Sequence, residues 1–138
     1  MDQSSGYGGA TMRAALLALG VLQLALGLFQ VVAPGAFFDT LGPFGERNDH
    51  YIRDAASWEL ALAAVAFVAA NRPSWRVPVL AIAAVHYALH AVNHLVDIGE
   101  SDPGWVGPVD FVALAVGAAA LVALWRYASR QQTDKEAT

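Results

Sequence analysis

The sequence contains no cysteine and only two methionines, Met1 and Met12. The lack of thiols excludes disulfides, thiolate metal sites and a cysteine nucleophile. A soft Cu(I) site is disfavoured as well, because thiolate and thioether sulfur are the ligands that Cu(I) prefers. Any chemistry must therefore come from histidine, carboxylate and amide side chains.

Charged residues are also scarce. They make up 14% of the 138 residues, whereas 57% are hydrophobic, and the mean hydropathy is +0.43. Soluble domains carry about 25% charged residues. The chain also lacks a glycine-rich phosphate loop, a G-x-S-x-G nucleophile turn and a basic patch for nucleic acid. We therefore expect one domain embedded in a lipid bilayer, with no nucleic-acid partner.

Four apolar stretches are long enough to cross a membrane, which takes about 20 helical residues. We expect spans at 12–33, 54–71, 77–98 and 108–127, between polar tails at 1–11 and 129–138. The N-terminal segment lacks the basic region and cleavage site of a secretory signal, so the first span is expected to be retained. Backbone groups in lipid must pair within their own segment, which makes the spans helices. The predicted fold is an all-α, integral membrane four-helix bundle.

The basic residues predict the orientation of this bundle. One side of the predicted membrane receives Arg13, Arg72, Arg76, Arg126, Arg130 and Lys135, and the other receives only Arg47 and Arg53. The positive-inside rule then places both termini in the cytoplasm, which fits a multi-pass protein of the cytoplasmic membrane. The outer side is acidic and can attract cations; its carboxylates are Asp39, Glu46, Asp49, Asp54, Asp97, Glu100, Asp102 and Asp110.

The first outer loop, PGAFFDTLGPFGERNDHY, is half apolar. We expect turns at Pro34-Gly35 and at Gly42-Pro43. The loop can be a lid over an outer pocket or an anchor in the membrane interface, and we favour the anchor. Tryptophans near the span ends are expected to form interfacial belts; they are Trp58, Trp75, Trp105 and Trp125.

A polar stripe interrupts the third span in the stretch HYALHAVNHLVD, residues 86–97. At about 100° per residue its polar side chains share one face of a helix; they are His86, His90, Asn93, His94 and Asp97. Ionisable groups within a span avoid lipid and face the bundle or a wet cavity. We therefore expect the stripe to point at the other helices.

The other spans bring polar groups toward the same region. In the first span Gln23, Gly27 and Gln30 lie at helical spacing, where a glycine permits close approach and amides can bond between helices. The second span begins with Arg53 and Asp54, expected as an ion pair, and carries Glu59 further in; the last span begins near Asp110, expected as a first-turn carboxylate. Glu59 is the hardest of these to explain by packing, because a carboxylate in a span must be protonated, paired or metal-bound.

This convergence predicts a transition-metal site in the outer half of the bundle. Imidazole with carboxylate suits Zn, Fe, Mn or Cu(II), and helix bundles build such sites from inward Glu and His. Our first-choice ligands are Glu59, His90 and His94, with His86, Asp54 and His50 in reserve. The supporting polar residues are Gln23, Gln30, Arg53, Asn93, Asp97 and Asp110. Haem is disfavoured, because its two axial histidines normally come from facing helices.

The sequence does not decide whether the protein is an enzyme. An enzyme would use metal-activated water or redox chemistry at the metal, with a neighbouring carboxylate as base. A second hypothesis is a non-catalytic accessory or assembly subunit of a larger membrane complex, in which the stripe is interhelical packing. A third is a proton-coupled carrier that depends on Glu59. Four short helices leave little room for a substrate path, so a carrier would need a homo-oligomer.

Short motifs resemble known proteins. The stretch MRAALLALGVLQLALGLFQVVAPGAFFDTLG resembles the DoxX-like group of small four-helix bacterial membrane proteins. The stretches NDHYIRDAASWELALA and HAVNHLVD look like uncharacterised actinobacterial members of that group. The resemblance covers most of residues 12–127 and implies a four-helix fold and a role in the envelope or in redox metabolism. Its pattern would match Asn48, His50, Arg53, Asp54 and His94.

Overall fold

A computed structural model describes residues 4–136, and this part of the chain is almost entirely helical. The elements are α1 (Ser4–Val32), α2 (Pro34–Thr40), α3 (Asp49–Asn71), η1 (Pro73–Trp75), α4 (Arg76–Val96) and α5 (Val106–Glu136). The described residues contain no β-strand, only an isolated bridge between Phe44 and Ser101. The prediction of an all-α fold is confirmed.

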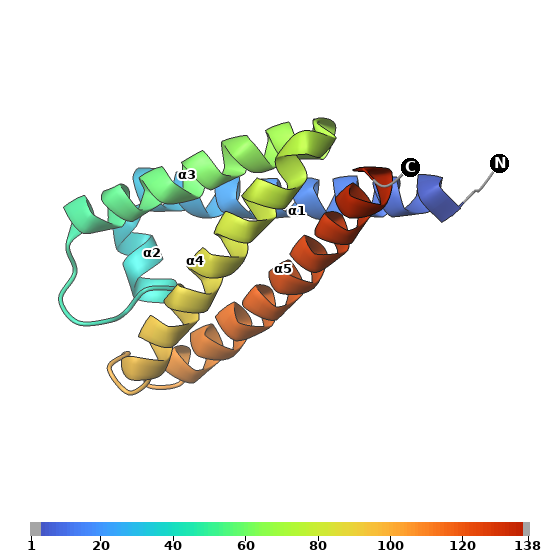
Figure 1. Ribbon diagram of the computed structural model, residues 1–138. Helices are drawn as coiled ribbons and strands as arrows, with labels where there is room; N and C mark the ends of the chain where they lie inside the picture. The colour runs from blue at the N-terminus through green and yellow to red at the C-terminus, as the bar shows by residue number, and fades with distance from the viewer. Residues whose placement is uncertain (1–3, 137–138) are drawn as a thin grey trace.

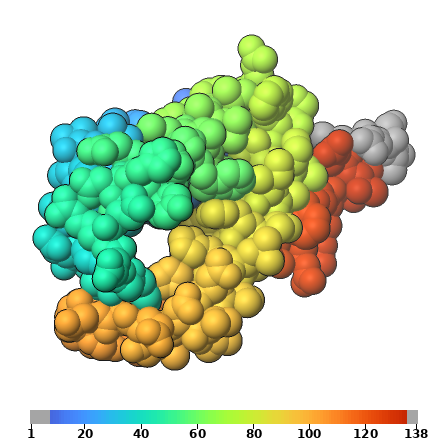
Figure 2. Space-filling model, turned by 90° about the vertical axis from the view of Figure 1, so that its left-hand side faces the viewer, coloured from blue at the N-terminus to red at the C-terminus, as the bar shows by residue number. Residues whose placement is uncertain are grey.

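The helices form two antiparallel pairs, α1 with α3 and α4 with α5 (Figure 1). The pairs meet at the end that carries η1, where α1 begins and α5 ends, and they separate toward the end that carries α2. Seen from the α2 end, the molecule is hollowed between the green atoms of α3 and the yellow atoms of α4 (Figure 2). The two pairs therefore enclose a space on the side where the sequence places its polar stripe.

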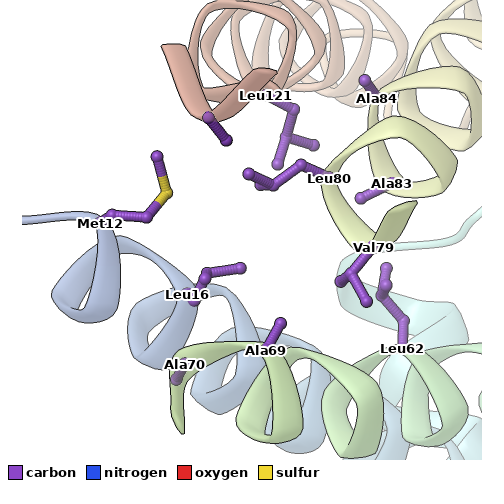
Figure 3. Packing of buried hydrophobic residues seen from close by; sticks show 11 residues of the cluster. Met12, Leu16, Leu62, Ala69, Ala70, Val79, Leu80, Ala83, Ala84 and Leu121 are labelled. Carbon is purple, nitrogen blue, oxygen red and sulfur yellow. The ribbon is translucent and has the colours of Figure 1, made fainter. Parts of the chain in front are cut away.

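The hydrophobic core lies where the pairs cross (Figure 3). Leu16 of α1 and Leu80 of α4 have no exposed surface, and Leu121 of α5 packs with them. The rest of the core is rich in alanine, which lets helices approach closely; its alanines are Ala69, Ala70, Ala83, Ala84 and Ala128. The packing is tight at the η1 end, which leaves the opposite end free for polar groups.

Gly27 has the role that its position in α1 predicts. A Cβ atom added there would lie 2.8 Å from Leu60 Cγ and 3.2 Å from Glu59 Cβ, both on α3. Only a hydrogen fits at this distance, so the glycine sets the separation of α1 and α3.

Within residues 4–136, three helices are long and apolar enough to cross a membrane: Gly8–Val32, Pro73–Val96 and Val106–Asp134. The last contains the fourth predicted span, and the other two overlap the first and third, ending one and two residues short of the predicted ends at 33 and 98. The second predicted span also forms a helix, α3, of 23 residues, which is long enough to cross a bilayer. Its composition is less apolar, because Asp54 and Glu59 lie in its first half.

The polar tails differ from expectation. As far as the structure describes them, residues 4–11 belong to α1 and residues 129–136 to α5. The two ends pack together, since a Cβ atom on Gly8 would collide with the Tyr127 hydroxyl. Ser129 also donates a hydrogen bond to the Trp125 carbonyl, which holds its side chain on the helix. The outermost parts of the predicted tails, 1–3 and 137–138, lie outside the described residues.

The loop at residues 34–51, which was predicted to be the first outer loop, contains a helix that the sequence did not predict. Pro34 was expected in a turn, but it is buried and starts α2, where a proline at the first position costs no hydrogen bond. The Phe37 ring of α2 packs edge-on against Phe29 of α1, with centroids 5.8 Å apart. After α2, the chain turns at Gly45, whose φ of +63° favours glycine.

Helix α3 begins five residues before the predicted span. The Asn48 side chain accepts hydrogen bonds from the backbone N–H groups of His50 (3.1 Å) and Tyr51 (3.3 Å), which caps the helix at this point. This cap gives Asn48 a structural role within the motif that resembles actinobacterial proteins.

Candidate functional site

The three histidines of the polar stripe lie along one face of α4, whereas Asn93 and Asp97 are exposed and Asp97 follows the helix as its C-cap. The ring centroids of His86 and His90 are 5.5 Å apart, and those of His90 and His94 are 4.8 Å apart. All three histidines are half-buried. They form a continuous row of imidazoles from the middle of α4 to its last turn.

His90 and His94 turn the same nitrogen toward each other, with their Nε2 atoms 3.1 Å apart. Two neutral imidazoles can share a hydrogen bond at this distance, one as donor and the other as acceptor. Two imidazoles bound to one tetrahedral ion, with bonds of about 2.0–2.1 Å, hold their nitrogens about 3.3 Å apart. The pair is therefore arranged for one proton or for one metal ion.

Asp110 of α5 lies behind His94. Its Oδ2 atom is 3.9 Å from His94 Nδ1, a buried nitrogen without a hydrogen-bond partner. A carboxylate in this position favours the tautomer with hydrogen on Nδ1, which leaves Nε2 free to bind an ion. Asp110 was expected in the first turn of its helix, but α5 begins at Val106 and so places Asp110 one turn later.

A pocket of about 180 Å³ opens over the histidine pair, and it is lined by Phe44, His90, Asn93, His94 and Asp97. The Phe44 ring stands edge-on to His94, with centroids 4.8 Å apart. The Phe44 segment is fixed to the opposite loop by the bridge to Ser101 and by the Asp102 N–H, which donates to the Pro43 carbonyl at 3.1 Å. This position fits a lid better than the interfacial anchor that we favoured.

His86 is covered by a residue that the sequence analysis assigned to the interfacial belt. The Trp58 ring of α3 lies against His86, with centroids 4.6 Å apart. The contact closes the inner end of the stripe. His86 is thus a packing neighbour of the His90–His94 pair, and the pocket residues do not include it.

Glu59 occupies a different place from the histidine pair. It is 9% exposed and packs at Gly27 of α1, and its Oε2 atom has no hydrogen-bond partner. Gln23 of α1 donates a hydrogen bond from Nε2 to the Tyr87 hydroxyl of α4 at 3.2 Å. This confirms the prediction that an amide side chain of the first span bonds to another helix. Sequence reasoning missed Tyr87, although its position, one residue after His86, places it on the neighbouring face.

His50 and Asp54 pair with each other at the start of α3, at 3.4 Å, and their side chains are 78% and 66% exposed. The expected partner of Asp54 was Arg53. In the described part of the chain, no three His, Asp or Glu side chains form a group that could hold a metal ion. The predicted trio of Glu59, His90 and His94 is therefore not assembled, because Glu59 faces α1 whereas the pair lies beside α5 and the outer loop.

No protein-family model, curated protein or solved structure matches this chain. The likeness to DoxX-like proteins thus stays a prediction from short motifs. Function has to be inferred from the geometry of the site.

Proposed function

We propose that this protein binds one divalent transition-metal ion between His90 and His94, at the outer face of the bacterial cytoplasmic membrane. The observation that carries the proposal is the opposition of the two Nε2 atoms at 3.1 Å within a pocket. Hydrophobic packing alone gives no reason for two ring nitrogens to converge on one point beside an open space.

The pocket can complete the coordination of such an ion. Asp97 and Asn93 line it together with the pair and offer oxygen ligands, and water can fill the remaining positions. Two imidazoles with oxygen suit Zn, Fe, Mn or Cu(II). A site with open positions can accept and release an ion, unlike the closed four-ligand sites that stabilise a fold. We therefore propose metal handling and assign no reaction.

The proposed topology gives this site access from outside the cell. We propose that α3 also crosses the membrane, which brings the number of spanning helices to four, since α3 runs antiparallel to α1 along the same axis (Figure 1). Five of the seven arginines belong to segments at the η1 end, where Arg13 donates to the Asn71 side chain at 3.3 Å. With that end in the cytoplasm, the pocket lies on the acidic outer side, whose field attracts cations.

Metal content tests the proposal. The protein, freed of its affinity tag, is loaded with Zn²⁺ in detergent, desalted and analysed by elemental mass spectrometry. We expect close to one ion per chain in the wild type and a loss of most of it in His90→Ala and in His94→Ala. The matched control is His50→Ala, which removes an exposed imidazole outside the pocket and should keep the ion.

The same variants distinguish a metal site from a packing role. If the pair only links two turns of α4, the wild type will hold no more metal than the alanine variants, and thermal unfolding will show those variants destabilised. That outcome would contradict metal binding and favour the accessory-subunit hypothesis. Circular dichroism of each variant establishes that the helices are intact before metal is counted.

A further inference from the structure

A second polar site lies between α1 and α3. Three buried side chains there carry oxygen atoms without any hydrogen-bond donor: Gln23 Oε1, Gln30 Oε1 and Glu59 Oε2. Their residues are 1%, 6% and 9% exposed, respectively. Buried polar atoms in native proteins are nearly always paired, so three orphaned acceptors in one interface need an explanation.

The three oxygens belong to neighbouring positions. Gln23 and Gln30 lie one turn on either side of Gly27, on the same face of α1. Glu59 of α3 packs directly at Gly27, since a Cβ atom there would be 3.2 Å from Glu59 Cβ. Both glutamines therefore lie within one helical turn of the point where Glu59 packs on α1. Tyr87 of α4 completes the surroundings, because its hydroxyl accepts from Gln23 and lies close enough to Glu59 to interact electrostatically.

In the part of the chain that the structure describes, no cationic side chain pairs with Glu59. On α1 Glu59 packs at Gly27, on α4 its electrostatic neighbour is Tyr87, and His86 is turned to Trp58. On its own helix, Asp54 is paired with His50 at the surface. Within residues 4–136, no ion pair involves Glu59. An ionised carboxylate would stand alone in an apolar interface, which is a costly arrangement.

A proton bound to Glu59 accounts for the unpaired oxygen atoms better than a bound metal ion does. Protonation turns one carboxyl oxygen into a donor, which can pair with an amide oxygen and so satisfy two of the three orphaned atoms. A hard cation prefers about six oxygen ligands around one point. The two amides and the carboxylate supply fewer oxygen atoms than that, so water would have to enter an apolar interface to complete the coordination.

We propose that Glu59 is a buried proton-binding site, in which its carboxylic acid donates a hydrogen bond to the amide oxygen of Gln23 or Gln30. The site is separate from the His90–His94 pair and holds whether or not that pair binds metal. It places an exchangeable proton at the interface of α1, α3 and α4, where a change in helix packing can expose or enclose it.

Infrared difference spectroscopy on the intact protein in lipid vesicles tests the proposal at neutral pH. Exposed carboxylates are ionised under these conditions. We expect a carboxylic-acid C=O band in the wild type that shifts in ²H₂O, disappears in Glu59→Gln and persists in His90→Ala. Removal of the accepting amide, in Gln23→Leu or Gln30→Leu, should move the band to higher frequency, because the hydrogen bond to the acid is lost.

Two spectroscopic outcomes would show that Glu59 does not hold a proton. If Glu59→Gln removes a carboxylate band and the wild type has no acid band, Glu59 is ionised and the proposal is wrong. Should Glu59→Gln fail to fold, Glu59→Asp serves instead, because a shorter acid keeps the proton and moves the band. A wild-type acid band that does not respond to either change belongs to another residue and also overturns the proposal.

Discussion

His90 and His94 face each other through their Nε2 atoms at 3.1 Å, one helical turn apart on α4. Successive imidazoles on a helix need not point at each other, since each ring can rotate toward solvent or lipid. Here the Phe44 ring on one side and Asp110 on the other hold His94 in place.

Asp110→Asn should weaken metal binding without abolishing it. The carboxylate lies 3.9 Å from His94 Nδ1 and favours the tautomer that presents Nε2 to an ion. Loss of such an outer partner typically lowers metal affinity about 10- to 100-fold. Competition with a metal-binding dye measures the change. Asp102→Asn, an exposed carboxylate on the adjoining loop, should leave the affinity unaltered; an equal loss in both variants would indicate a general effect of outer charge.

Gly27→Val should destabilise the protein by about 1–3 kcal/mol, the usual cost of overpacking. The new side chain would meet Leu60 at 2.8 Å from its Cγ and would force α1 away from α3. Thermal unfolding in detergent measures the loss. Gly9→Ala is the matched control on the same helix, because a Cβ atom there meets nothing within 4 Å. Unchanged stability of Gly27→Val would show that the two helices can separate freely.

Asp49 should titrate below its usual range in the folded protein. Arg47 donates a hydrogen bond to it at 2.7 Å, and this bond, more than their charge attraction, lowers the pKa of Asp49. A lowered folded-state pKa stabilises the fold above the unfolded pKa, and this contribution is lost as pH falls through the folded value. NMR titration of the carboxyl should show the pKa rise in Arg47→Gln. The same pKa in both proteins would exclude the ion pair in solution.

The orientation can be tested directly because the chain has no cysteine of its own. We expect Glu46→Cys, in the outer loop, to react with a membrane-impermeant maleimide on intact cells. Ser74→Cys, in η1, should react only after the membrane is permeabilised. The reverse pattern would place the termini outside, and labelling of both in intact cells would contradict a crossing by α3.

Hydrophobic length and helical periodicity predicted the four long helices and the row of histidines on α4, since both depend on local spacing along the chain. They could not predict which helix each polar group would meet. Glu59 and His90 were expected to be ligands of one ion, but Glu59 packs against α1, where Gly27 leaves room for it. Trp58 was assigned to the membrane interface because of its place near a span end, yet it covers His86. Such partners depend on how the two helix pairs cross.

The outer loop illustrates the same limit. Its apolar side chains indicated that it would not extend freely into water, but two placements remained open. The bridge from Phe44 to Ser101 joins the two outer loops, and it brings the Phe44 ring to His94. A contact between segments 57 residues apart has no signature in local composition.

X-ray absorption spectroscopy at the zinc edge of the Zn²⁺-loaded protein tests the central proposal most directly, because it identifies the atoms bound to the ion. We predict a first shell of nitrogen and oxygen at about 2.0–2.1 Å, with outer-shell scattering from two imidazoles. His94→Ala should retain little zinc, and the spectrum of that remainder should show at most one imidazole. A spectrum without imidazole scattering, or one that is the same in wild type and variant, would contradict a metal site at His90 and His94.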